Sequence, residues 1–252
     1  MKKVFQTLQN YIEYLEKLGP AKSINLMRGV GYERVNSLSG KIDKDRIIHL
    51  ASSLSDQKIL DLLNNIPEEN IIEIMEFNTD SDLVYYIDQL SIEEMKLLCA
   101  SINADEMGLM TREIGKEDCV KLLKSVGVDK AVGLINYLNI KKVINLAKQV
   151  EVDKLIILTN SLTLSEAKKW IRKRGIDDVV PILNGIGLEN MVEFLDILGF
   201  SKCFELLELL GIEKLIELTH KISKMRFPTS HPQRKIKKKT LSDSHQSVFI
   251  RE

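Results

Sequence analysis

The residues of this chain best suited to contact an anion lie in one segment, 167–175, which reads AKKWIRKRG. Five cationic side chains surround the only tryptophan, Trp170, and they are Lys168, Lys169, Arg172, Lys173 and Arg174. Clusters of lysine and arginine attract phosphates, acidic protein segments and anionic lipid headgroups. They are also typical of solvated helix faces, on which the long side chains cover apolar surface. The segment is therefore a candidate binding site, with a solvated face as the alternative.

A second group of cations lies in the run RKIKKK and comprises Arg234, Lys235, Lys237, Lys238 and Lys239. Residues 226–252 show no helical spacing of apolar residues and contain prolines and serines, which predicts a flexible basic tail. Such a tail either anchors a nucleic acid or an acidic protein, or only increases solubility. Its apolar run, Val248, Phe249 and Ile250, could dock on the last helix, on a groove of the body or on another subunit.

Oxygen-bearing side chains gather at Thr79, Asp80, Ser81 and Asp82, directly after Asn78. Calcium loops of the EF-hand type also need a glycine and a distal glutamate at fixed positions, and both are missing here. The pattern instead predicts a helix N-cap followed by acidic residues in the first turn of the helix.

Histidines and cysteines show none of the spacings of a metal or redox site. The histidines are His49, His220, His231 and His245, and the cysteines are Cys99, Cys119 and Cys203. We expect the cysteines to be small core residues in the reducing cytoplasm, and we expect no metal and no cofactor. The glycines are spread along the chain, and no phosphate-binding loop or nucleophile motif occurs, so we expect a protein that is not an enzyme.

A period of twelve residues positions those of these side chains that lie in residues 7–222. It begins at Thr7 and runs to Gly211 through eighteen units. The residue that opens each unit, here called the turn residue, is glycine or a typical N-cap or turn residue in all units except the one opened by Glu151. The turn residues are Thr7, Gly19, Gly31, Asp43, Ser55, Pro67, Thr79, Ser91, Asn103, Gly115, Gly127, Asn139, Glu151, Thr163, Gly175, Gly187, Gly199 and Gly211.

Each unit predicts one short helix with a buried stripe. The residue seven positions after the turn residue, position +7, is apolar in every unit and includes Trp170, which we therefore place in the core. Positions +4, +7, +8 and +11 share one helix face. We expect helices over about positions +1 to +9 and turns of about three residues, with capping boxes at Ser91 and Thr163 and a shortened or kinked helix at Pro181.

These units predict an all-α fold, an α-solenoid or superhelix of about eighteen short helices, because a register kept over so many units requires stacking of equal elements. Position +6 is more apolar in every second unit, as at Leu109, Ile157 and Pro181, which predicts 24-residue helix hairpins as the structural repeat. We expect residues 1–225 to form this domain and residues 226–252 to form the tail.

The charge distribution distinguishes these two regions. The chain holds 36 basic and 36 acidic residues, of which seven basic and two acidic residues lie in 226–252. The tail is therefore plus five and the body minus five. No apolar stretch approaches the roughly 18 residues of a membrane-spanning helix, and no signal-peptide core precedes the period, so we expect a cytoplasmic protein.

Three segments, LSIEEMKLLCAS at Ser91, IPEENIIEIMEF at Pro67 and LGIEKLIELT at Gly211, carry a resemblance over residues 7–222. They resemble the short-helix units of the cytoplasmic N-terminal superhelix in MgtE-type magnesium transporters and, more distantly, helices of the flagellar switch protein FliG. The resemblance implies a right-handed superhelix or hairpin solenoid. It carries over no magnesium-binding residue, and the chain lacks the CBS-type domains and membrane helices of those transporters.

The favoured functional hypothesis is a protein-interaction scaffold or adaptor that presents its concave face to a protein segment. Nucleic-acid binding through the basic cluster and the basic tail is the alternative, for which the acidic body is unfavourable. A soluble regulator of a transporter or motor is a third possibility, and it depends on the resemblance alone.

Overall fold

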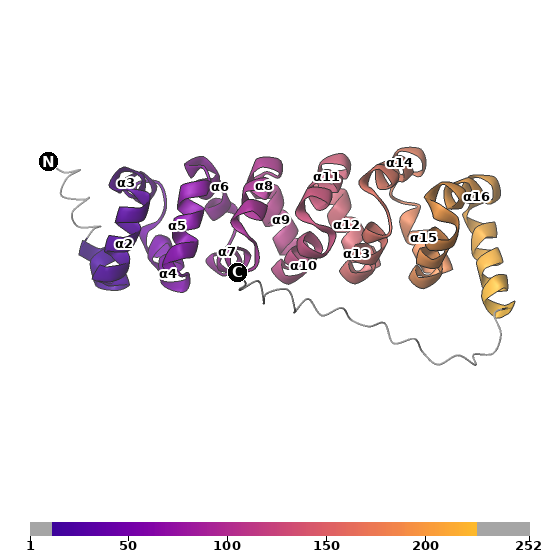
Figure 1. Cartoon of the computed structure of the whole chain (residues 1–252), viewed down its shortest axis with the longest axis horizontal. Coiled ribbons are helices and arrows are strands. Elements are labelled where there is room, and N and C mark those ends of the chain that lie inside the picture. The colour runs from indigo at the N-terminus through magenta and orange to yellow at the C-terminus, as the bar shows by residue number, and fades with distance from the viewer. Residues whose placement is uncertain (1–11, 226–252) are drawn as a thin grey trace, which may run out of the picture.

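A computed structural model describes residues 12–225, in which every regular element is an α-helix. Residues 12–18 are helical, and the following helices form an elongated array (Figure 1). Their bounds are α2 Pro20–Val30, α3 Tyr32–Ser39, α4 Lys44–Ser53, α5 Asp56–Asn65, α6 Glu68–Phe77, α7 Asp80–Gln89, α8 Ile92–Ser101, α9 Ala104–Ile114, α10 Lys116–Val126, α11 Val128–Leu138, α12 Ile140–Val150, α13 Val152–Asn160, α14 Leu164–Arg174, α15 Val179–Ile186 and α16 Leu188–Met225. The all-α helical repeat is confirmed.

The turns keep the twelve-residue phase throughout the described chain. Within α16, Gly199 and Gly211 have φ values of 75° and 74°, so this element consists of three helices, 188–198, 200–210 and 212–225. At Gly175 the turn is longer, and α15 begins only at Val179. Pro181 is the third residue of α15, where its missing N–H needs no helical partner. The expected shortening at Pro181 is confirmed.

Most helices are connected by two kinds of turn that are shorter than the expected three residues, whereas the turns 40–43, 161–163 and 175–178 have three or four residues. In one kind, an extended apolar residue ends a helix and an N-cap with negative φ opens the next, as with Leu90 and Ser91. Ser91 and Thr163 form the expected capping boxes with Glu94 and Glu166. The oxygen-rich segment also follows the N-cap prediction, because Thr79 accepts a hydrogen bond from the backbone N–H of Asp82 and opens α7.

In the other kind, a single residue ends one helix and opens the next. Such a residue has a positive φ, for example 89° at Gly127. This region of backbone space favours glycine, because a Cβ there approaches the backbone. Asn139 at 73° and Glu151 at 69° occupy the same conformation with side chains. Glu151, the exception in the sequence pattern, is therefore a strained turn residue.

Most helices pack against the third helix along the chain, and several, such as α10 and α11, also pack closely against the next one. The closest such pairs include α2 with α5, α6 with α9, α8 with α11, α9 with α12 and α10 with α13. Helices two apart touch weakly at most within the described chain. The repeat that stacks is therefore three helices, or three units of twelve residues, and the predicted 24-residue hairpin is wrong. The apolar +6 residues that suggested hairpins are not deeply buried: Ile157 is 46% exposed, and Pro181 is exposed.

Polar contacts follow the same three-helix spacing. A cation at position +3 donates to the carbonyl that ends a helix 32 residues later, as Lys22 Nζ does to Leu54 O at 2.6 Å and Arg46 Nη2 to Asn78 O at 3.0 Å. Helix C-termini carry unpaired carbonyls and partial negative charge, so a cation stabilises them. These contacts connect successive three-helix repeats, which are here called turns of the array.

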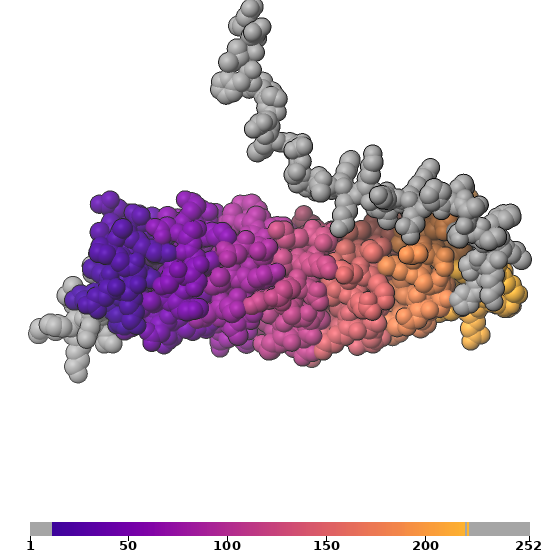
Figure 2. Space-filling view, turned by 90° about the horizontal axis from the view of Figure 1, so that it is seen from below, coloured from indigo at the N-terminus to yellow at the C-terminus, as the bar shows by residue number. Residues whose placement is uncertain are grey.

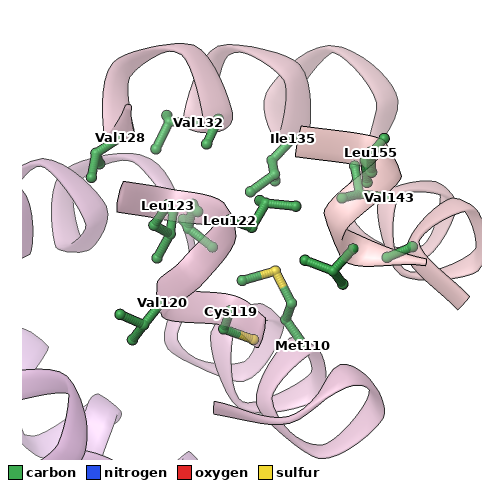
Figure 3. Packing of buried hydrophobic residues seen from close by; sticks show 14 of the residues in the cluster. Met110, Cys119, Val120, Leu122, Leu123, Val128, Val132, Ile135, Val143 and Leu155 are labelled. Atoms are coloured by element: carbon green, nitrogen blue, oxygen red, sulfur yellow. The ribbon is translucent and has the colours of Figure 1, made fainter. Parts of the chain in front are cut away.

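One continuous apolar core runs along the array from Leu26 to Leu207. Figure 3 shows its middle, where Met110, Cys119 and Leu123 are fully buried between neighbouring helices. Trp170 is 6% exposed, which confirms its predicted place in the core. The described residues together form an elongated rod (Figure 2). No helix within residues 12–225 is long and apolar enough to cross a membrane.

Candidate anion-binding groove on α14

Helix α14 holds the basic segment in a fixed orientation. It begins at the capping box of Thr163 and Glu166 and ends at Gly175, whose φ is 82°. Ala167 and Trp170 are the residues that it buries. The helix packs against α11, the third helix before it, and its side chains contact the 200–210 helix that follows. The cationic side chains therefore lie at the joints between successive turns of the array.

Trp170 packs in the core beneath the basic segment, against two phenylalanines of the 200–210 helix. Its ring lies 6.3 Å from the ring of Phe200 and 6.1 Å from that of Phe204, centroid to centroid, the second in an edge-on arrangement. Edge-on aromatic pairs at this separation are favourable beyond the area that they bury. The tryptophan supports the segment from the core rather than offering a stacking surface.

The structure divides the five cations of the cluster into two groups. Lys173 Nζ lies 3.3 Å from Glu208 Oε1, and Arg174 Nε lies 3.2 Å from Asp178 Oδ2. The other three cations have no carboxylate partner among residues 12–225, and they are Lys168, Lys169 and Arg172. Lys141, Lys142 and Lys214 also lack an ion-pair partner in the described chain, and what distinguishes the three cations of α14 is that they line one hollow.

These three cations line a single open hollow together with Tyr137, Leu164 and Ser165. Tyr137 is 41% exposed, and it comes from the last turn of α11. Ser165 comes from the first turn of α14. The hollow, here called the α14 groove, thus spans the joint between α11 and α14. It combines three positive charges with two hydroxyl groups.

Aromatic rings position two of the ammonium groups. Lys168 Nζ lies 5.6 Å from the centroid of the Tyr137 ring, and Lys169 Nζ lies 5.8 Å from that of Phe200. A ring face attracts a cation without neutralising it. The rings therefore leave both ammonium groups available to an external anion. A carboxylate or a phosphate group fits this donor set, because each accepts several hydrogen bonds from cations and hydroxyls.

Thiols and side chains that can ligate a metal occur in the described chain. No cluster of three His, Cys, Asp or Glu side chains within 12–225 has the geometry to hold a metal ion. Burial raises the pKa of the Cys119 thiol to about 12 and that of Cys99 to about 11. A thiol with such a pKa is almost fully protonated at neutral pH and is a poor nucleophile. Cys119 is buried as expected, whereas Cys99 and Cys203 are only partly buried.

The tail cations named above, Arg234, Lys235, Lys237, Lys238 and Lys239, lie outside the described residues. Tyr137 and Ser165 were not predicted from the sequence as site residues. Tyr137 precedes Lys168 by 31 residues, a separation that places two residues side by side only when three helices complete a turn. The signal that would have found it is the three-helix repeat.

No protein-family model, no curated protein and no solved structure matches the chain.

Proposed function

We propose that this protein is a non-enzymatic interaction scaffold, and that its α14 groove binds an acidic segment of a protein partner. The observation that carries this proposal is the set of Lys168, Lys169 and Arg172 around one hollow, with no carboxylate partner in the described chain. Cations on a protein surface gain most from an external anion when no internal carboxylate competes for them.

The stacked architecture supports a scaffold. Each helix contacts only its near neighbours, so the array offers a long exposed surface instead of one enclosed site. The three free cysteines support a reducing compartment, and we place the protein in the cytoplasm.

Charge favours a protein partner over a nucleic acid. Duplex DNA carries one negative charge per roughly 1.7 Å of its axis, so its binding needs cations along an extended track. The body of this chain is minus five overall, and the groove offers three unpaired cations. Nucleic-acid binding through the groove together with the basic tail remains the second candidate, and the test separates the two.

The test compares two triple charge reversals of the whole chain. One replaces the groove cations by Lys168→Glu, Lys169→Glu and Arg172→Glu. The matched control, Lys141→Glu, Lys142→Glu and Lys214→Glu, makes the same charge change at exposed cations that have no ion-pair partner in the described chain. Affinity purification with quantitative mass spectrometry should recover a specific protein set with the wild type and the control, and lose it with the groove variant.

Two results contradict this proposal. If both variants recover the same proteins as the wild type, the groove is not the binding surface. If nuclease treatment removes the recovered proteins, and filter binding shows a steep salt dependence that is lost on deletion of residues 228–252, the second candidate is correct.

A further inference from the structure

The last two units of the array expose the residue at position +7, which is buried or half-buried in every earlier unit of the described chain. Position +7 is 6% exposed at Trp170 and 1% at Ile182, but 37% at Leu206 and 41% at Leu218. The third helix along the chain packs against most earlier helices, as α15 does against α12, whereas none follows the helices that hold Leu206 and Leu218 in the described chain. No further unit of the period follows Met225, because the next one would place Pro228 inside a helix and Ser230 at position +7.

The exposed residues of the stripe help to line a cavity. Leu206 and Leu218 line a cavity of about 190 Å³ together with other apolar residues of α15 and α16, among them Phe194, Leu210 and Leu215. Leu209, one helical turn from Leu206, is 74% exposed. It stands at position +10, which carries polar residues in many other units, among them Gln89, Ser101, Glu113, Ser125, Gln149 and Ser161. Leu206, Leu209 and Leu218 are here called the end face.

The sequence beyond the described residues contains one segment that suits this face. Val248, Phe249 and Ile250 are the only three consecutive apolar residues in 226–252. They follow Met225 after a link of 22 residues, 226–247. An unstructured chain of 22 residues would have an end-to-end distance of roughly 25 Å, which is enough for the segment to reach the end of the rod. Tethering also raises its effective concentration at the face to roughly the millimolar range.

Charge favours the same chain over a second copy as the occupant. Residues 188–225 hold seven acidic and four basic residues, a net charge of minus three. Residues 228–252 hold six basic and two acidic residues, a net charge of plus four. Two copies meeting end to end would bring two negative ends together, whereas the tail brings opposite charge to the face.

We infer that residues 248–250 fold back within the same chain and cover the end face of Leu206, Leu209 and Leu218. The basic run 234–239 assists by its attraction to the acidic last helices. The tail thereby replaces the missing next unit of the array. This inference is independent of the function proposed for the α14 groove.

Photo-crosslinking of the full-length chain tests this arrangement. Replacing Leu209 by p-benzoylphenylalanine places a crosslinker on the end face at a side chain that is already mostly exposed, so the fold tolerates it. Ile157, 46% exposed in the middle of the rod, is the control position. Irradiation of a mixture of normal and isotope-labelled chains, followed by mass spectrometry, should give a crosslink from position 209 to residues 246–252 of the same chain, and none from position 157.

Tail variants complete the test. With Phe249→Ser, the yield of the crosslink from position 209 should fall at least tenfold, whereas Phe249→Leu should retain most of it. Crosslinks between normal and labelled chains at position 209 would show a second copy as the occupant and overturn the inference. Crosslinks at position 209 that are insensitive to Phe249→Ser, or their absence, would overturn it as well.

Discussion

Gly108 of α9 lies against the backbone of Phe77, the last residue of α6. A Cβ built on Gly108 would stand 2.5 Å from the carbonyl oxygen of Phe77. These two helices are three apart in the chain, so this approach belongs to the contact that joins successive turns of the array. A backbone carbonyl that ends a helix cannot move aside as a flexible side chain would.

We therefore predict that Gly108→Ala destabilises the fold. Alanine usually stabilises a helix interior by about 1 kcal/mol relative to glycine. Overpacking costs typically 1–3 kcal/mol, and here the neighbour is rigid, so we expect a net loss of about 1–2 kcal/mol. The control is Gly40→Ala, because Gly40 has a φ of −85° and a Cβ there would meet nothing closer than 3.5 Å. Urea unfolding followed by circular dichroism should show a lower midpoint for the first variant only.

The strained turn at Glu151 yields the opposite prediction. Glu151→Gly relieves a side chain at a φ of 69° and should stabilise the protein by about 1 kcal/mol. The exposed pair that Glu151 forms with Lys154 contributes little and does not offset this gain. Asn139→Gly should gain less, because the Asn139 side chain caps the N–H of Lys142.

Ser91→Gly is the matched control for Glu151→Gly. Its φ of −72° needs no glycine, and the change removes a capping box, so the thermal midpoint should fall. An equal rise in midpoint for Ser91→Gly and Glu151→Gly would refute the strain argument.

Arg46 connects two turns of the array through several contacts. Its guanidinium donates to the carbonyl of Asn78 at 3.0 Å and, through Nε, to Asp80 Oδ1 at 2.7 Å. Arg46→Met removes the cation that caps the end of α6 and leaves Asp80 without its nearest partner. We expect the free energy of unfolding to fall by about 2 kcal/mol, since hydrogen bonds to charged groups contribute roughly 1.5–3 kcal/mol.

Lys96→Met provides the comparison for Arg46. Lys96 pairs with Glu93 three residues away on an exposed surface, at 3.2 Å, and such pairs contribute little. In chemical denaturation, the unfolding midpoint of Arg46→Met should be clearly lower than that of Lys96→Met. Equal midpoints would mean that the contacts between turns add nothing to stability.

The phase of the repeat is predictable from sequence because every turn needs a special residue at a fixed place. The turn residues Gly127, with its positive φ, and Ser91, with its capping box, could be predicted from their residue types. The helix against which each helix packs could not. Apolar residues at position +6, such as Ile157, suggested burial by a hairpin, but they lie on the surface.

The candidate site was predictable only in part. Its cations form a run in the sequence, but their partners come from other turns of the array. Glu208 neutralises Lys173 from 35 residues away, and Tyr137 approaches Lys168 from 31 residues away. The links from Arg46 were equally invisible, because two of their acceptors are backbone carbonyls, which a sequence does not distinguish.

Cysteine labelling gives a last prediction, which depends on pH. Burial raises the pKa of Cys119 to about 12 and that of Cys99 to about 11, so at pH 8 the thiolate fraction of each is about a thousandth or less. Both should react with iodoacetamide far more slowly in the folded protein than in urea. Because the thiolate is the nucleophile, the rate for the partly buried Cys99 should rise about tenfold per pH unit up to about pH 10. Mass spectrometry of each cysteine peptide measures these rates, and a rate for Cys99 that levels off near pH 8.5 would contradict its raised pKa.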